Sequence, residues 1–341
     1  MNNYILKDEN AVYYECNYSC DNQIFLNING RKFLLTDARY SIEARNLVQN
    51  TEVIEIKNSL ISEARTLLRK FRVKSLVFDP NDFSYADFIK LSENLRINFI
   101  SKPFFSKKKR MVKSADEIEL LKKAASLGEA CFDEVAKFIS DNGLGMSESE
   151  IYHNSEIILK QKGSLELSFS PIIAINENAA KAHALPTSKT LKNGDLLLMD
   201  AGVKFKRYCS DRTRTALFDG SLEFGKEQSF KDSKMNEVYH IVKEAQSLAL
   251  KAVKPGMMAC EVDRVAREFI AKNGFGKEFF HSTGHGVGLD IHELPNINTK
   301  DRTILKKGMV FSVEPGIYLE NEFGVRIEDV VVVTDDGCEI L

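Results

Sequence analysis

The chain has 341 residues, which is enough for about two domains of ordinary size. Hydrophobic residues make up 43% and charged residues 28%, a balance typical of globular proteins. The formal net charge of -2 excludes a general electrostatic attraction to nucleic acid or to an anionic membrane, and no apolar run approaches the roughly 20 residues of a membrane span. We therefore expect neither a nucleic-acid partner nor a membrane partner.

The N-terminus and the cysteines bear on the compartment. The opening segment, MNNYILKDEN, carries charge and asparagine where a signal peptide would have an apolar core. Six cysteines are scattered along the chain without a CxxC pair, and we interpret them as reduced thiols. Both observations predict a cytoplasmic protein.

Short apolar segments alternate with helical patterns in the first hundred residues. Branched and aromatic residues predict strands at 23–28, 32–37, 51–56 and 75–79. Apolar positions three and four apart predict helices at 59–71 and 84–95. This alternation predicts a small α/β domain.

A basic segment separates this part from the remainder. Five lysines and arginines lie between positions 107 and 113, next to Pro103. A nucleic-acid patch is one interpretation, but we favour a solvated interdomain linker. The expected domains are therefore 1–112 and 113–341.

The second half begins with helices. Ser114 and Ser147 are each followed three residues later by glutamate, the signature of a capping box, and each predicts a helix start. Two further amphipathic helices are expected at 232–253 and 259–273. Strands are predicted at 169–175, 194–202, 208–218, 308–318 and 324–334. This half is therefore expected to be α+β, with mostly antiparallel strands.

One internal repeat links two of these strands. Residues 191–202 align without gaps on 305–316, and the alignment places Asp200 on Glu314. A second acid follows each copy, Asp211 in the first and Glu328 in the second. We expect a pseudo-twofold domain with a site on its axis.

Hairpin pairing would bring these acids together. If Val203 pairs with Tyr208, Asp200 lies opposite Asp211, and if Tyr318 pairs with Gly324, Glu314 faces Glu328. Pro315 predicts an interruption of the second strand. Close carboxylates in apolar strands must share a proton, pair with cations or bind metal. Taken singly, each acid could instead form an ion pair with a nearby arginine: Arg212, Arg214 or Arg326.

Histidines supply further candidate groups. His281, His285 and His292 lie within one glycine-rich segment, and the first two share a face if the segment is extended. His292 needs a bend near positions 289–290 to join them. His183 lies upstream of the first acidic strand and is either a loop residue or part of the site. The two remaining histidines, His153 and His240, fall in predicted helices and are interpreted as structural. Carboxylates with an imidazole suit two divalent transition ions.

The motifs MDAG, YCSDRTRT, HSTGHGVGLDIHE, VEPGIY and GVRIED occur in this order. Over about 115–341 they resemble the pita-bread metallopeptidases, the family of methionine aminopeptidase, prolidase and Xaa-Pro aminopeptidase. The segment LLTDARYSIEA resembles the N-terminal domain of creatinase and prolidase, which favours the proline-specific branch. The resemblance implies an α+β pita-bread catalytic domain after a smaller α/β creatinase-type domain. One departure is Arg207, where relatives often have glycine.

The resemblance also implies a cofactor and its ligands. Two divalent ions are expected, Mn²⁺ first and Co²⁺ or Zn²⁺ as alternatives. The implied ligands are Asp200, Asp211, His285, Glu314 and Glu328. Asp211 and Glu328 would bridge both metals, Asp200 would complete one, and His285 with Glu314 would complete the other. A shared water or hydroxide would attack the scissile carbonyl, and Glu314 would carry its proton to the leaving nitrogen.

Substrate-binding roles are implied for the remaining residues. His183, His281 and His292 would bind substrate and stabilise the oxyanion. Tyr318 and Arg326 would contact either the metal ligands or the substrate. The implied enzyme is an Xaa-Pro aminopeptidase that acts, as a homodimer, on peptides with proline at the second position.

Three alternatives remain open. A prolidase would cut only dipeptides, with Arg326 available for the free carboxylate of the substrate. Creatinase-type hydrolysis without metal is disfavoured because the ligand set is complete. A catalytically silent pita-bread binding module would be expected to lack one or more of these ligands.

Overall fold

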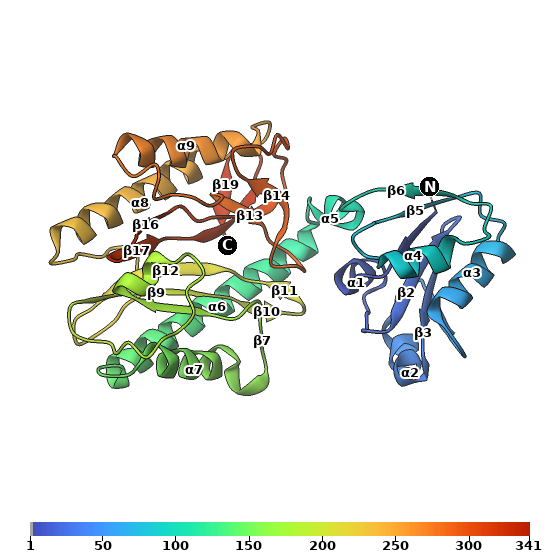
Figure 1. Cartoon of the computed structure of the whole chain (residues 1–341), viewed down its shortest axis with the longest axis horizontal. Coiled ribbons are helices and arrows are strands. Elements are labelled where there is room, and N and C mark those ends of the chain that lie inside the picture. Colours follow the sequence, from blue (N-terminus) through green and yellow to red (C-terminus); the bar gives the residue numbers. More distant parts are fainter. Residues whose placement is uncertain (1–2) are drawn as a thin grey trace. The chain divides into compact units, whose positions relative to one another are not determined.

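The structure of the protein is a computed structural model that describes residues 3–341 (Figure 1). The chain divides into two compact units, Met1–Arg110 and Met111–Leu341. This division falls two residues before the boundary that the sequence predicts. Each unit is described by itself.

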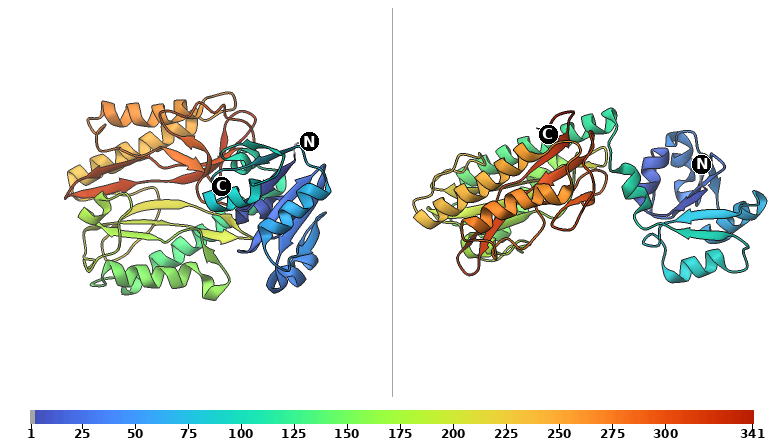
Figure 2. Two further views of the ribbon diagram at one scale, coloured as in Figure 1. Left: turned by 45° about the vertical axis from the view of Figure 1, so that its right-hand side comes forward. Right: turned by 90° about the horizontal axis from the view of Figure 1, so that it is seen from above.

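The first unit contains one mixed sheet with strand order β4-β3-β2-β1-β5-β6. The strands are β1 (Tyr4–Leu6), β2 (Gln23–Ile28), β3 (Arg31–Thr36), β4 (Glu52–Glu55), β5 (Ser75–Phe78) and β6 (Asn98–Ser101). The helices are α1 (Glu9–Cys16), α2 (Ala38–Leu47), α3 (Leu60–Lys70), α4 (Tyr85–Ser92) and α5 (Phe105–Arg110). Alternate side chains of β2 enter two different hydrophobic cores. Ile24 and Leu26 lie in one core with residues of α3, and Phe25 lies in the other with residues of α1 and α2. Helices therefore cover both faces, as Figure 2 also shows, and the α/β arrangement is as predicted.

The sequence patterns locate β2 to β5, α3 and α4 within a few residues but miss β1, β6, α1 and α2. The two missed helices are short and polar, so their apolar periodicity is weak. A local signal is nevertheless present, because Asp8 and Asp37 cap them by accepting hydrogen bonds from Ala11 N and Arg39 N.

The expectation of a solvated interdomain linker is only partly correct: the two units divide within this basic segment and Lys108 and Lys109 are exposed, but the segment is not an open linker. Four of its five basic residues lie in α5. Arg110 is only 1% exposed and donates to Ser106 Oγ (2.7 Å), and Lys109 forms an ion pair with the buried Glu15. Phe105 packs on the core beside α1, which pulls this short helix onto the first unit. Lys113, at the start of the second unit, is also buried.

The first half of the second unit consists of two helices and two small sheets. Its helices are α6 (Ala115–Asn142) and α7 (Glu148–Leu159), and both have the predicted capping boxes. One sheet has the order β12-β9-β8 and the other β11-β10-β7. The strands are β7 (Glu166–Leu167), β8 (Ile172–Ile175), β9 (Asp195–Ala201), β10 (Val203–Phe205), β11 (Tyr208–Cys209) and β12 (Arg212–Phe218). Two 3-10 turns, Gln161–Gly163 and Asn176–Ala180, connect them.

The second half repeats this plan. Helices α8 (Ser233–Ala252) and α9 (Ala259–Lys272) precede a sheet with the order β14-β13-β15-β18-β19 and the hairpin β16-β17. The strands are β13 (Gly284–Gly286), β14 (Glu293–Ile297), β15 (Val310–Val313), β16 (Gly316–Leu319), β17 (Phe323–Arg326), β18 (Asp329–Val333) and β19 (Cys338–Ile340). Figure 1 shows α6 and α7 on one side of the central strands and α8 and α9 on the other.

Equivalent backbone contacts recur in the two halves. The N–H of Leu191 donates to Met146, and at the matching place the N–H of Leu305 donates to Met257. The glycines that open the two repeats both have left-handed backbones, with φ of 91° at Gly194 and 84° at Gly308. Each of these glycines donates to the far end of its partner strand, at Phe218 and Val333 respectively. The predicted repeat is thus present in the fold.

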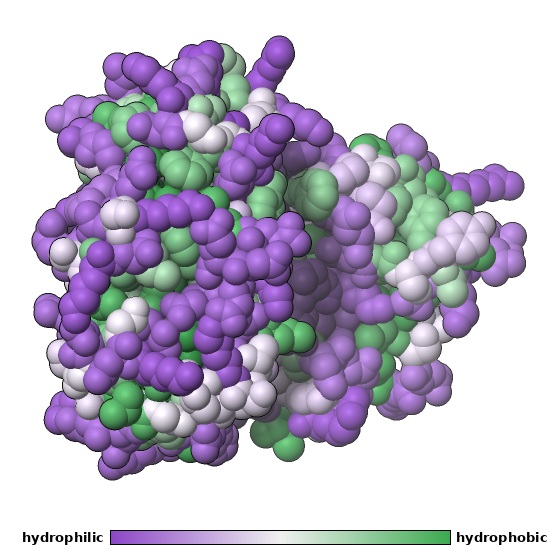
Figure 3. All heavy atoms as spheres, turned by 60° about the vertical axis from the view of Figure 1, so that its left-hand side comes forward, coloured by the Kyte–Doolittle hydropathy of each residue, from purple (hydrophilic) through white to green (hydrophobic). Residues whose placement is uncertain are grey.

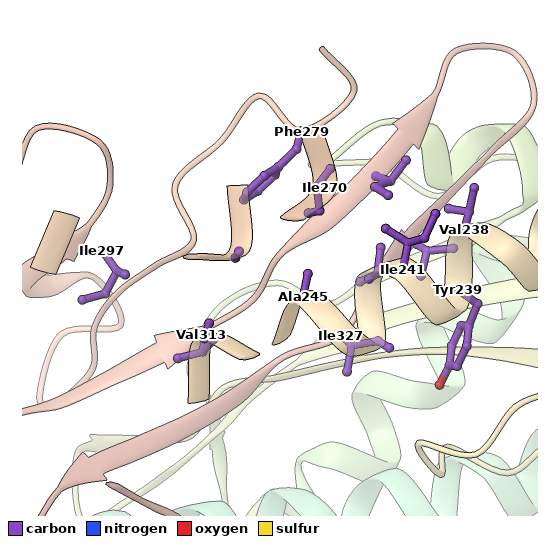
Figure 4. Packing of buried hydrophobic residues seen from close by; sticks show 14 of the residues in the cluster. Val238, Tyr239, Ile241, Ala245, Ile270, Phe279, Ile297, Val313 and Ile327 are labelled. Atoms are coloured by element: carbon purple, nitrogen blue, oxygen red, sulfur yellow. The ribbon is translucent and has the colours of Figure 1, made fainter. Parts of the chain in front are cut away.

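The strands that carry the acids are buried on both faces. In β9, Leu197 and Met199 pack against α6 and α7, whereas Leu196 and Leu198 pack against the core of the second half. Side chains alternate along a strand, so Asp200 lies on the same face as Leu196 and Leu198 and points toward the second half. Figure 4 shows part of that core, where Val313 and Ile327 precede the acids Glu314 and Glu328. Dense packing around these positions fixes the backbone of the acids.

The surface is that of an ordinary globular protein. On the face drawn in Figure 3, hydrophilic residues cover most of the area and apolar residues are scattered among them. Across residues 3–341, none of the helices combines the length and the apolarity needed to span a membrane. The six cysteines are free thiols, four of them buried, which agrees with the interpretation as reduced, small apolar residues.

Candidate metal centre

The first acidic pair arises from the hairpin between β9 and β12. The predicted pairing of Val203 with Tyr208 is wrong, because Phe205 pairs with Tyr208 and Asp200 lies opposite Thr213. The cause is a two-residue turn at Lys206-Arg207, where φ is 46° and 72°. The error is two residues, and an even shift keeps each side chain on its face. Asp211 is therefore a diagonal neighbour of Asp200 rather than its direct partner.

The second acidic pair has the predicted register. Tyr318 pairs with Gly324 in the hairpin, and Val313 pairs with Asp329 in the adjoining sheet. The same register sets Glu314 opposite Glu328. The strand is interrupted at Glu314-Pro315, between β15 and β16, as the proline predicts.

These acids converge with one imidazole. Potential ligand atoms of Asp211, His285 and Glu328 lie within 4.8 Å of one another. His285 Nε2 is 3.6 Å from Asp211 Oδ2 and 3.4 Å from Glu314 Oε1. His285 Nδ1 lies 3.1 Å from the carbonyl oxygen of Gly286, so we assign the ring proton to Nδ1 and the lone pair of Nε2 to the acids.

The electrostatics of the cluster call for cations. Burial, reinforced by the other carboxylates, raises the pKa of Asp211 and of Glu328 well above their usual ranges. Burial also raises the pKa of Glu314 to about 8 and lowers the pKa of His285, which favours a neutral imidazole. Protons alone or bound cations could relieve this concentration of negative charge.

Two unpaired oxygens distinguish between these possibilities. Asp200 Oδ1 and Glu328 Oε1 are buried without a hydrogen-bond partner, and an unpaired buried carboxylate oxygen is costly. Three buried carboxylates, the partly buried Glu314 and a neutral imidazole that offers its lone pair form the donor set that divalent transition ions prefer. The residues present therefore fit a group of divalent cations.

Arg326 holds the cluster together rather than facing substrate. It is 3% exposed, and its guanidinium donates to Asp200 Oδ2 at 2.6 Å and to the hydroxyl of Tyr318 at 2.8 Å. Further donor groups bond to Thr213 Oγ1 and to the carbonyl oxygen of Ala182. Four of the five N–H groups of the guanidinium are thus used within the protein.

The histidines differ in environment. His281 Nε2 lies 2.8 Å from the Tyr318 hydroxyl, and burial lowers the pKa of His281 to about 4. His292 is the last residue of a bend at 288–292; its side chain is exposed, and its ring packs on His285 with centroids 4.4 Å apart. His183 is exposed on the loop before β9. His153 and His240 are exposed on α7 and α8 and do not join the cluster.

Two buried acids that the sequence patterns do not single out brace the histidine segments. Glu148 in α7 accepts hydrogen bonds from Ile175 N (2.6 Å) and Thr187 N (2.7 Å), on either side of the His183 loop. Asp263 in α9 accepts from Thr283 Oγ1 at 2.8 Å, between His281 and His285. In the sequence, Glu148 has the position of an acid in the first turn of a helix, which is usually exposed. Asp263 lies four residues before Arg267, the spacing of an ordinary ion pair on a helix surface. Neither position indicates that the acid is buried.

Comparison with known proteins agrees with this chemistry. The family model for metallopeptidase family M24 matches residues 119–335. An Xaa-Pro dipeptidase from Pyrococcus furiosus is 35% identical over 299 residues, which cover 88% of this chain and 76% of that protein. An uncharacterized peptidase from Bacillus subtilis, YqhT, is 34% identical over 304 residues, which cover 89% and 82%.

Solved structures match nearly the whole chain. An Xaa-Pro dipeptidase from Bacillus anthracis superposes with a TM-score of 0.91 at 32% identity, covering 99% of this chain and 92% of the other. An X-Pro aminopeptidase from Thermotoga maritima superposes with a TM-score of 0.88 at 33% identity, covering 100% and 95%. The fold thus matches enzymes named for either activity.

Proposed function

Because the chain belongs to metallopeptidase family M24, and is therefore a metal-dependent peptidase, we propose that it hydrolyses the bond between an N-terminal residue and a following proline. The observation that carries the chemistry is the cluster of four carboxylates, three of them buried, around a neutral His285, with two carboxylate oxygens unpaired. The preference for proline rests on the names of its relatives.

We propose a dipeptidase first. The sequence motifs alone favour an aminopeptidase, but relatives named Xaa-Pro dipeptidase match this chain in both sequence and structure. The aminopeptidase remains the second candidate because an X-Pro aminopeptidase matches the whole chain almost equally well. An aminopeptidase must leave room in its site for the peptide chain that follows the proline, whereas a dipeptidase closes that space.

The ligand set proposed for two metal ions is Asp200, Asp211, His285, Glu314 and Glu328, and we propose Mn²⁺ as the ion. Asp211 and Glu328 are the residues that would bridge the two ions, because their ligand atoms lie within 4.8 Å of each other and of His285, and both are at most 8% exposed. Two bound ions supply Lewis-acid activation of water and of the scissile carbonyl. Arg326 orients Asp200 through its 2.6 Å contact.

Glu314 is the proposed proton carrier. Its side chain is 16% exposed compared with 5% for Asp211, so it is the more accessible of these acids. The prolyl nitrogen of the substrate bears no hydrogen and must gain a proton to leave. Glu314 takes a proton from the attacking water and transfers it to that nitrogen, while the water oxygen stays on the carbonyl carbon.

The histidines are proposed to contact substrate. His281 and His292 lie beside the acid cluster, and His183 lies on an exposed loop from which it can reach a peptide. An imidazole N–H of His183 or His292 placed there would stabilise negative charge on the carbonyl oxygen in the transition state. The neutral His281 ring has Nδ1 at the carbonyl oxygen of Ser282 and Nε2 at the Tyr318 hydroxyl, so it would act by holding Tyr318.

The test compares three substrates with Mn²⁺ supplied: an Xaa-Pro dipeptide, the matching Xaa-Pro-Xaa tripeptide and an Xaa-Ala dipeptide. The proposal predicts rapid cleavage of the Xaa-Pro dipeptide and weak cleavage of the other two. Preferential cleavage of the tripeptide would establish the aminopeptidase instead. Equal cleavage of Xaa-Ala and Xaa-Pro dipeptides would remove the claim of proline specificity.

A further inference from the structure

A buried ion pair lies outside the acid cluster. Lys113 Nζ is 2.9 Å from Glu293 Oε2, and each side chain is 1% exposed. Residues this deeply buried must compensate each other, because an unpaired buried charge costs several kcal/mol. The partners are 180 positions apart in sequence, so the pair closes a long loop of the chain.

Lys113 is fixed at the start of the strand that leads to Glu314. Its backbone N–H donates to the carbonyl oxygen of Gly308 at 2.8 Å, and the neighbouring Val112 bridges to Met309. A Cβ at Gly308 would lie 2.9 Å from the carbonyl oxygen of Lys113, so the two backbones are in direct contact. The lysine side chain therefore extends from a rigid base.

Glu293 directly follows His292 and fills the inside of the bend at 288–292. Its Oε1 accepts a hydrogen bond from Asp290 N at 3.2 Å, and a Cβ at Gly288 would lie 2.6 Å from Oε2. The carbonyl oxygen of Gly288 in turn accepts from Cys209 N at 2.8 Å. The carboxylate thus lies against Gly288, where the bend begins, and accepts a hydrogen bond from Asp290 within the bend that places the His292 ring on His285.

We propose that Lys113 and Glu293 are a positioning pair for His292. Lys113 holds the Glu293 carboxylate, and the carboxylate holds the bend. Loss of Lys113 removes a cation from beside this buried carboxylate, and we expect the carboxylate to shift and to take the bend with it. This inference rests on the proposed substrate contact of His292.

The experiment measures kcat, KM, bound metal and unfolding free energy for Lys113→Met, Glu293→Gln and the double variant. Misplacement of a reacting group by about 1 Å can cost about 100-fold, so each single variant should lose roughly 10- to 100-fold in kcat with metal content unchanged. The double variant should recover most of this loss, because removing both charges of a buried pair is often close to neutral. Lys122→Met, which breaks an exposed pair with Glu339, is the matched control and should leave kcat unchanged.

The same substitutions in a His292→Ala background separate positioning from general stability. If the pair acts through His292, Lys113→Met should lower kcat no further once the imidazole is gone. An undiminished effect in that background, or an unchanged kcat in a less stable Lys113→Met protein, would overturn the inference. A double variant that folds but stays as slow as the single variants would also overturn it. Should Lys113→Met fail to fold, Glu293→Gln and the double variant carry the comparison.

Full activity of His292→Ala itself would instead contradict the proposed role of that histidine. It would leave the hydrolytic function intact, so the two failures are distinguishable.

Discussion

The two halves of the catalytic unit share a backbone plan but differ in the groups they bring to the cluster. In each half a strand begins after a left-handed glycine, Gly194 or Gly308, and carries an acid near its end. The first half supplies two aspartates, and its two histidines, His153 and His183, are exposed. The second half supplies two glutamates, the partly buried His285 and the arginine that pairs with the first half. The backbone repeated in the two halves thus determines where the acids lie. The side chains that differ between the halves determine which charged groups contact those acids.

The loops that carry the histidines differ in the same way. The first half holds its loop with Glu148 and with the Arg326 bond to the carbonyl oxygen of Ala182, whereas the second half uses Asp263 and the Lys113–Glu293 pair. The histidines whose rings lie beside the acids or each other, His285 and His292, come from the second half. We therefore expect substitutions in the second half to have larger effects on turnover than equivalent ones in the first.

The largest effect should come from the two proposed bridging acids, one from each half. Asp211→Asn and Glu328→Gln should each leave a folded protein that binds little metal and loses several orders of magnitude in kcat/KM. Both acids are buried where carboxylates have raised pKa values, so only a bound cation stabilises their charged forms. Circular dichroism and elemental analysis of the purified variants provide the controls. Full activity of either variant with metal supplied would show that the bridging acid from that half of the catalytic unit is not needed for hydrolysis.

The next effect concerns the histidines. Loss of one transition-state donor typically costs roughly 100- to 1000-fold, so His292→Ala should lose about this much in kcat while retaining metal. His281→Ala should also lower kcat with metal retained, because His281 Nε2 holds the Tyr318 hydroxyl. His183→Ala should cost less, since both His183 and His292 are exposed but only the His292 ring packs on His285. Steady-state kinetics on one Xaa-Pro dipeptide would rank them. The reverse order would contradict the comparison between the halves.

Removing the metal should make stability depend on pH. The pKa of Glu314 is raised to about 8 in the folded chain, so between its ordinary range and about pH 8 the folded state binds more protons than the unfolded state. The unfolding free energy of the chelated protein should therefore fall as pH rises through this window. Thermal unfolding at several pH values with chelator measures it, and Glu314→Gln should flatten the dependence. Equal slopes in the two proteins would contradict this origin.

The smallest effect concerns the two hairpin turns. Arg207 has a φ of 72° in the first hairpin, a conformation that costs a non-glycine residue about 1 kcal/mol, whereas the second hairpin uses Asn321 at 61°. Arg207→Gly should raise the unfolding free energy by roughly 0.5–1 kcal/mol without changing kcat. Asn321→Gly is the matched control and should change it less, because asparagine tolerates this conformation. A destabilised Arg207→Gly protein would show that contacts of the arginine side chain outweigh the strain.

The sequence predicts much of this arrangement because the information is local. The repeat, the helix caps and the proline at 315 each reside in a short segment, and the register of the second hairpin follows from one turn. The first hairpin escapes prediction because nothing in Lys206-Arg207 signals a left-handed turn.

Long-range contacts escape prediction altogether. Lys113 reads as part of a charged linker, and only folding brings it to Glu293. In the same way, the four hydrogen bonds that commit Arg326 to the protein interior come from segments far apart in the chain. A charged residue in a single sequence does not reveal whether its partner is solvent, substrate or a buried acid.

The central claim is that both halves together bind two divalent ions. It is tested most directly by titrating the metal-free chain with Mn²⁺ and following bound metal and Xaa-Pro dipeptide hydrolysis in the same samples. The account predicts two equivalents of tightly bound metal per chain, with full activity reached only at the second. Full activity at one equivalent, or activity that persists without metal, would contradict it.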